Sequence, residues 1–371
     1  MNLLIKRVVA VASVILFIVF LKEFNSFDKT EMVTTTGYSY EKAIVTEVVE
    51  DNVSEDGMRV GYQQLKVKIL AGTKEGEILD ATSSEGNLFG AVCRKGDKVI
   101  VNISVAGDNV VASVYAKDRS MQIYFFVGFF LLLICVIGGK NGVKAVAGLI
   151  FTLVSIIWIY MPAVYRGYSP FGVSVSVCVI TTFVTMMLIG GMTRKTACAI
   201  IGTTLGVLMS GISAWAFGVS ADIDGFNVSN IETLMYVAQN TKIQVGDLLF
   251  SGILIASLGA VMDVAMSVSS TIFEIKENVP DIDAVSLFKS GMNVGKDMMG
   301  TMSNTLILAF VGGSLSTLVI DYAYDLPYEQ LINSYSIGIE IMQGVAGSIG
   351  VILAVPITAA ITSIMLTKKE R

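Results

Sequence analysis

Two blocks of sequence, GAVMDVAMSVSS (259–270) and GKDMMGTMSNTLILAFVGGSL (295–315), decide how this chain folds. Each combines apolar residues with a few polar side chains, with Asp263 inside the first block and Asp297 near the start of the second. Such runs fit bilayer-spanning helices, in which a charge costs about 2.5–3.5 kcal/mol on insertion scales. The blocks therefore predict two membrane helices at which something polar is handled.

The composition of the whole chain also indicates a membrane protein. Of 371 residues, 53% are hydrophobic and only 15% are charged, against about 25% charged in an average soluble domain. The net charge of −5 and the lack of a basic cluster argue against nucleic-acid binding. The chain has no histidine, and its four cysteines form no CxxC pair. We therefore expect no imidazole catalysis, disulfide framework or thiolate metal site, and no cofactor.

Seven apolar segments after residue 120 are long enough to cross a bilayer, which takes about 20 helical residues. They are 121–138, 143–164, 171–192, 196–219, 245–268, 298–320 and 337–366, the last of which we expect Pro356 to bend. An eighth run, 8–21, fits either a signal-peptide core or a membrane anchor. We favour an uncleaved anchor, because Lys22, Glu23 and Phe24 follow it in place of a small-x-small cleavage site.

The distribution of Lys and Arg predicts the orientation of these helices, because basic residues collect on the cytoplasmic side. With a cytoplasmic N-terminus, the short outer loops of the C-terminal bundle hold only Arg166 and Lys242. The inner segments hold Lys6, Arg7, Lys140, Lys144, Arg194, Lys195, Lys276, Lys289, Lys296, Lys368, Lys369 and Arg371. We predict an α-helical polytopic membrane protein with eight transmembrane helices and both termini in the cytoplasm.

Residues 25–120 then form a separate extracytoplasmic domain. Their apolar residues alternate in the manner of strands, as at Leu65, Val67 and Ile69 and at Val99, Val101, Ile103 and Val105. Turn signals recur at Ala71-Gly72, Gly76, Lys95-Gly96-Asp97 and Gly107-Asp108-Asn109. The pattern predicts a small antiparallel barrel or sandwich, OB-like. The expected domains are an anchor (1–24), this β-domain (25–120) and a seven-helix membrane domain (121–371).

The polar residues of the two opening blocks form a candidate substrate or ion site. Ser267 lies one turn from Asp263, and Asp297, Thr301, Asn304 and Thr305 share one face of the next helix. If the two helices are antiparallel neighbours, both carboxylates lie at a similar depth, where they could bind a cation or relay a proton. The metal, if any, is left open. The structural alternative is that Asp263 pairs with Lys296 and only joins the two helices.

Two further features complete the candidate residues. Glu340, near the outer end of the last helix, is either part of a polar site or faces lipid headgroups. Small residues recur every four positions on the fifth predicted helix, which favours close helix packing, at Gly202, Gly206, Ser210, Ala214 and Gly218.

The two blocks resemble the signature blocks of the YibE/F-like bacterial membrane proteins, and the resemblance covers about residues 121–366. It implies a multi-pass protein of the bacterial cytoplasmic membrane. It supplies no substrate and no catalytic residues. It does add weight to Asp263, Asp297 and Asn304, which lie within the matching blocks.

The leading functional hypothesis is a transporter or permease-like protein of unknown substrate, with the polar site between the sixth and seventh helices. The alternative is a cell-envelope scaffold or assembly factor whose outer β-domain docks a protein partner. An intramembrane enzyme is disfavoured, because Asp247 and Asp263 lie 16 residues apart on one helix, about 24 Å along its axis. The sequence leaves the substrate, the direction of transport and the oligomeric state open.

Overall fold

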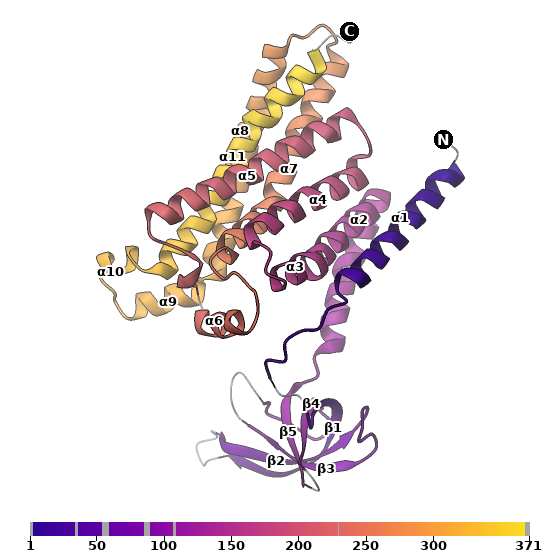
Figure 1. Ribbon diagram of the computed structural model, residues 1–371, viewed down its shortest axis with the longest axis vertical. Helices are drawn as coiled ribbons and strands as arrows, with labels where there is room; N and C mark the ends of the chain where they lie inside the picture. Colours follow the sequence, from indigo (N-terminus) through magenta and orange to yellow (C-terminus); the bar gives the residue numbers. More distant parts are fainter. Residues whose placement is uncertain are drawn as a thin grey trace. The chain divides into compact units, whose positions relative to one another are not determined.

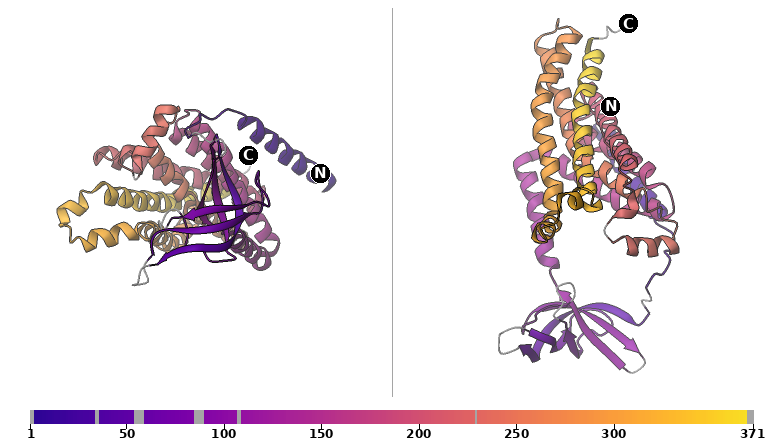
Figure 2. Two further views of the ribbon diagram at one scale, coloured as in Figure 1. Left: turned by 90° about the horizontal axis from the view of Figure 1, so that it is seen from below. Right: turned by 90° about the vertical axis from the view of Figure 1, so that its left-hand side faces the viewer.

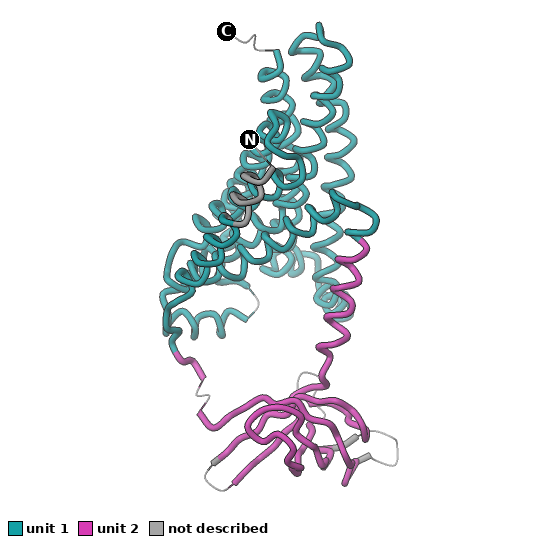
Figure 3. Tube along the Cα trace, turned by 90° about the vertical axis from the view of Figure 1, so that its right-hand side faces the viewer, with its two compact units in different colours: residues 1–30, 134–371 teal, residues 31–133 magenta. Residues whose placement is uncertain are grey.

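The computed structural model describes residues 3–33, 36–53, 59–84, 90–106, 109–228 and 230–367. The chain divides into two compact units, residues 1–30 with 134–371, and residues 31–133 (Figure 3). Part of the predicted turn at Gly107-Asp108 and the basic residues Lys368, Lys369 and Arg371 lie outside the described residues. The two units are taken in turn.

The smaller unit is a closed five-stranded barrel, so the barrel prediction is confirmed and the sandwich alternative is wrong. Its strands are β1 (Tyr38–Val53), β2 (Arg59–Ile69), β3 (Ile78–Ser83), β4 (Lys98–Ala106) and β5 (Asn109–Lys117). They join in the order β1-β2-β3-β5-β4 (Figure 1). All neighbouring pairs are antiparallel except β3 and β5, which run parallel. Closure leaves no open sheet edge.

The barrel interior is filled by the alternate residues that the sequence pattern predicts. Leu65, Val67 and Ile69 on β2 are buried, as are Val99, Val101 and Ile103 on β4. Val105 has the same parity as the buried β4 residues but is 44% exposed, because it lies past the end of the core. Side chains two residues apart in a strand share one face, so the alternation alone identifies most of this core.

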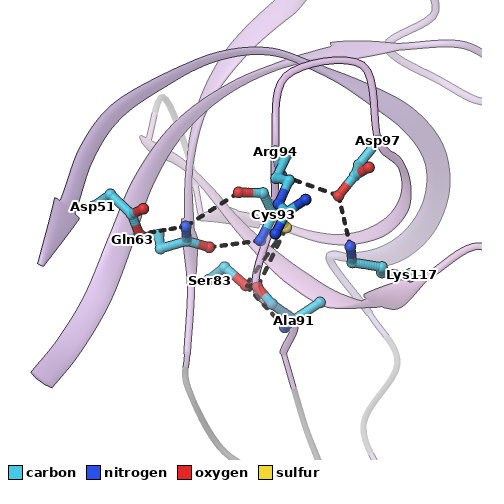
Figure 4. A network of polar contacts seen from close by, with 8 residues as sticks. All are labelled: Asp51, Gln63, Ser83, Ala91, Cys93, Arg94, Asp97 and Lys117. Atoms are coloured by element: carbon cyan, nitrogen blue, oxygen red, sulfur yellow. Dashed lines mark hydrogen bonds and ion pairs between the residues drawn. The ribbon is translucent and has the colours of Figure 1, made fainter. Parts of the chain in front are cut away.

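Side chains complete the barrel wall beside β3 (Figure 4). The Gln63 amide accepts from Cys93 N at 2.7 Å and donates to Cys93 O at 3.2 Å and to Asp51 at 2.7 Å. Ser83 Oγ bonds both backbone polar groups of Ala91. In the adjoining turn, Lys117 donates to Asp97 at 2.7 Å and holds the pKa of that carboxyl below its ordinary range. These bonds satisfy buried polar groups that the strand ladders leave unpaired.

Gly72→Ala is expected to destabilise the barrel more than Gly76→Ala. Both glycines have positive φ, +118° and +87°, so alanine is strained at both. Only at Gly72 would the new Cβ collide with a neighbour, 2.4 Å from the carboxyl carbon of the buried Glu41. The excess is about 1–3 kcal/mol, measured as faster amide exchange of barrel peptides in the full chain. Equal exchange in the two variants would contradict this contact.

The larger unit consists of helices. They are α1 (Leu3–Phe24), α3 (Met161–Tyr165), α4 (Pro170–Gly190), α5 (Arg194–Ser220), α6 (Ile231–Asn240), α7 (Leu248–Asn278), α8 (Ala284–Gly313), α9 (Leu315–Ala323), α10 (Tyr328–Ile332) and α11 (Tyr335–Thr367), with most of α2 (Ser120–Ser155). Two views show α5, α7, α8 and α11 packed together (Figures 1 and 2). Their core contains Val261, Val264, Val268, Val351 and Val355.

Helix α2 is two helical arms joined at a sharp reversal. Gly139 has φ 53° and ψ −130°, which interrupts the helix. A Cβ on Gly142 would lie 2.1 Å from the carbonyl oxygen of Ile134, whereas residues eight apart in a straight helix are separated by about 12 Å. The reversal therefore falls in the connector between the predicted segments 121–138 and 143–164.

Among the described residues, five helices are long and apolar enough to cross a membrane, and a sixth is obtained if α8 and α9 count as one span. The five are Ser120–Tyr165, Pro170–Gly190, Arg194–Ser220, Leu248–Asn278 and Tyr335–Thr367. One boundary differs clearly from prediction. The segment predicted as 298–320 begins at Ala284, where Asp283 caps the helix by accepting from Val285 N and Ser286 N, and it bends by 61° near Ser314. Helix α11 runs through Pro356 without a break.

Candidate functional site

The strongest candidate site is a pair of adjoining cavities, here called the Glu340 cavity, between the α8–α9 bend and α11. One has a volume of about 200 Å³ and is mainly apolar, and the other has a volume of about 300 Å³ and carries polar groups. Both are lined by Glu340, Ser314, Leu318 and Ile337. The polar part adds Asn227, Thr317, Ser336 and Gln343.

The bend between α8 and α9 creates one wall of the Glu340 cavity. Helix α8 ends at Gly313, Ser314 has φ −98° and ψ 9°, and α9 leaves at 61° to α8. Irregular backbone at membrane depth is tolerated where protein or a cavity surrounds it, because lipid offers no hydrogen bonds. Broken helices of this kind carry binding sites in many transporters. The sequence Val-Gly-Gly-Ser (311–314) supplies the flexible residues for the bend.

Glu340 is the charged group of this cavity. It lies half-buried on α11, with Gln343 about one turn further along, and no hydrogen bond or ion pair of its side chain is found among the described residues. Asn227 approaches from the short helix Gly225–Asn227, which Asp224 caps by accepting from Phe226 N at 2.9 Å. One carboxylate with amides and hydroxyls provides the hard oxygen ligands and hydrogen bonds that suit a cation or a polar solute.

The predicted residues of the two opening blocks lie on exposed faces of α7 and α8. Asp263, Asp297, Thr301 and Asn304 are exposed and Ser267 is half-buried, and none of them lines the Glu340 cavity. The helices are neighbours, because a Cβ on Gly291 of α8 would lie 2.5 Å from Ile272 of α7. The structure thus places Glu340 in a cavity, apart from the other predicted site residues.

The structural alternative for Asp263 requires an ion pair with Lys296. Asp263 and Lys296 form no ion pair in the described part of the chain, and each is exposed. The hydroxyls on α8 serve the helix itself, with Thr301 donating to Met298 O at 3.0 Å and Thr305 to Thr301 O at 2.9 Å.

Sequence reasoning missed a set of buried hydroxyls inside the bundle. Eight such oxygens have no hydrogen-bond partner within the described residues: those of Ser155, Thr182, Thr185, Thr203, Ser210, Ser303, Thr358 and Ser363. Thr358 Oγ1 lies directly against Gly202, 2.0 Å from where a Cβ would be. These residues are visible in the sequence as Ser and Thr at helical spacing. They were missed because hydropathy scales treat Ser and Thr as nearly neutral. Buried hydroxyls without partners make the interior more polar than a lipid-like core.

Comparison with known proteins yields one family. The model of the YibE/F-like protein family matches residues 126–368. No curated protein and no solved structure matches the chain. The match covers well over half of the chain and includes α4, α5, α7, α8 and α11. Together with the apolar helices it identifies a membrane protein in contact with the lipid bilayer, and the chain belongs to the YibE/F-like protein family.

Proposed function

We propose that this protein transports a small cation or polar solute across the bacterial cytoplasmic membrane, without enzymatic activity. One observation carries the proposal: a carboxylate, Glu340, lines a cavity at the point where helix α8 breaks. The buried hydroxyls supply further polar groups inside the bundle. Cavities at discontinuous helices are where transporters bind substrates and coupling ions, and an ionisable residue kept in a membrane is usually functional.

The proposed topology has eight spans, both ends in the cytoplasm and the barrel outside. The spans are α1, the two arms of α2, α4, α5, α7, α8 with α9, and α11. The ends of α1 and of α3, which continues the second arm of α2, lie together, since Arg166 donates to Phe24 O at 2.5 Å and lies 4.6 Å from the Phe24 ring centroid. At the opposite end, Ser269 donates to Lys195 O at 2.9 Å. Both contacts agree with the predicted topology, in which Phe24 and Arg166 lie on the outer side of the membrane and Lys195 lies on the cytoplasmic side.

The test of this function is ion or solute flux. Full-length protein in liposomes, with imposed gradients of H⁺, Na⁺, K⁺ or Mg²⁺ and ion-sensitive dyes inside, should show flux above protein-free liposomes. A thermal-shift screen across cations, pH and small metabolites would select the solutes to test. Neither flux nor a ligand-dependent shift with any of these probes would contradict the proposal.

As a second cation site on the transport path we propose Asp263, a carboxylate within the α7 span and apart from the Glu340 cavity. Asp263→Asn is then expected to reduce this flux by at least about tenfold while leaving the fold intact. Asp263 is exposed on α7 and has no ion-pair partner among the described residues, so the neutral amide costs little packing, and 1.4 kcal/mol of lost cation binding corresponds to a factor of ten. Lys296→Met is the control for nearby charge. Equal loss of thermal stability in both variants, with flux unchanged, would instead assign Asp263 a structural role.

A scaffold role for the barrel is the second candidate function. Tyr38, Tyr40 and Tyr62 are 54%, 61% and 61% exposed on its surface. Exposed tyrosines are enriched in protein interfaces. Deleting the barrel residues 28–118 would separate the two functions: loss of a cellular phenotype with unchanged flux would favour the scaffold.

A further inference from the structure

The barrel unit contains a cavity of about 620 Å³ at the point where β5 leads into α2. Its charged lining residues are Lys42, Lys98, Lys117 and Arg119, with Asp97 and Asp118. All of them belong to the unit of residues 31–133.

Both acidic side chains of this cavity form ion pairs within the cavity, whereas two of its basic side chains do not. Lys42 lies 3.2 Å from Asp118, and Lys117 lies 2.7 Å from Asp97. Hydrogen bonds from the Ser120 hydroxyl and backbone N–H, with Lys42, hold the pKa of Asp118 at about 2, so it is ionised at neutral pH. Lys98 and Arg119 are exposed and have no ion-pair partner among the described residues. The cavity therefore has positive charge available for an anion.

The same cavity continues into an apolar surface. Met121 and Gln122, in the first turn of α2, are part of its lining. The next turn presents Phe125 and Phe126, which are 73% and 74% exposed. An anion held by Lys98 and Arg119 would thus lie at the base of a bare apolar helix. A ligand that is anionic at one end and apolar at the other matches both surfaces.

We propose that this cavity binds the phosphate group of an anionic membrane phospholipid. Arg119 and Lys98 contact the phosphate, for which the guanidinium fork is well shaped. The acyl chains lie along the first turns of α2. The proposal relies on the first arm of α2 lying in the bilayer, as in the proposed topology, and it is independent of whether the protein transports anything.

The test is native mass spectrometry of full-length protein released from nanodiscs that contain equal amounts of phosphatidylglycerol and phosphatidylcholine. Wild-type protein should retain phosphatidylglycerol preferentially. Each basic residue near an anionic lipid contributes about fivefold in affinity, so Lys98→Gln/Arg119→Gln should weaken retention by about twenty-five-fold. Lys98→Arg/Arg119→Lys, which keeps both charges, should retain the lipid.

The matched control is Lys66→Gln/Lys74→Gln. It removes the same charge from barrel residues that do not line the cavity and that pair with Glu47 and Glu77, and it should leave lipid retention unchanged. Equal loss in the control and the cavity variant would overturn the proposal, as would unchanged retention in the cavity variant. Displacement of the lipid by submillimolar inorganic phosphate would assign the cavity to a soluble anion instead. Flux measured on the same proteins reports separately on transport.

Discussion

Glu340→Gln is expected to lower the initial rate of flux through the full-length protein in liposomes by at least about tenfold. The substitution keeps the size of the side chain and removes only its charge. A carboxylate about 4 Å from a cation contributes about 4 kcal/mol of attraction at an effective dielectric constant of 20. Water around the half-buried Glu340 side chain reduces this attraction. A loss of 1.4 kcal/mol already corresponds to a factor of ten.

The matched control for this prediction is Glu329→Gln. Glu329 lies on the neighbouring α10, is exposed and does not line the Glu340 cavity. It should leave flux within about twofold of wild type, because water and salt screen an exposed surface charge that does not line the site. Equal flux in wild type and the folded Glu340→Gln variant would place the transport site elsewhere. An equal loss in both variants would indicate a general effect of surface charge.

The barrel was the part most readable from sequence. Leu65, Val67 and Ile69 alternate with Lys66 and Lys68, so the pattern separates core-facing from solvent-facing side chains at each position. The buried residues of the strand can therefore be read directly from the sequence. The bonds of Gln63 to Cys93 were out of reach, because they join residues 30 apart and follow no local pattern. Local periodicity thus identified the core and not the side chains that complete its wall.

The membrane unit was harder to read for a physical reason. Lipid tails are as apolar as leucine side chains, so the sequence of α7 identifies a span without showing which face is buried. Val261, Val264 and Val268 face the core, and Asp263 is exposed on another face. The bend at Ser314 was missed for the same reason, since Val-Gly-Gly-Ser is apolar and small enough for a continuous helix. As a result the sequence identified Glu340 without its cavity.

Gly350→Ala and Gly206→Ala are each expected to destabilise the bundle by about 1–3 kcal/mol, the usual range for overpacking. Gly206 and the four other small residues spaced four positions apart on α5 are buried. A Cβ on Gly350 would lie 2.7 Å from the Cβ of Ser210 and 2.8 Å from the backbone oxygen of Gly206. A Cβ on Gly206 would lie 2.8 Å from the Cβ of Ala354. Backbone atoms cannot rotate away as a side chain does, so α5 and α11 must separate.

Gly252→Ala on α7 isolates this steric effect from helix propensity. A Cβ there meets nothing within 4 Å, and alanine is favoured over glycine in a helix by about 0.8–1.0 kcal/mol, so this variant should be as stable as wild type or more stable. Thermal unfolding of the detergent-solubilised chain, followed by the fluorescence of Trp158 and of Trp215 on α5, measures all three. The midpoint should fall by several degrees in the α5 and α11 variants alone. If instead their midpoints are unchanged and flux is lost, the α5–α11 contact is a surface that slides during transport. The added methyl group would then hinder that movement without destabilising the folded state.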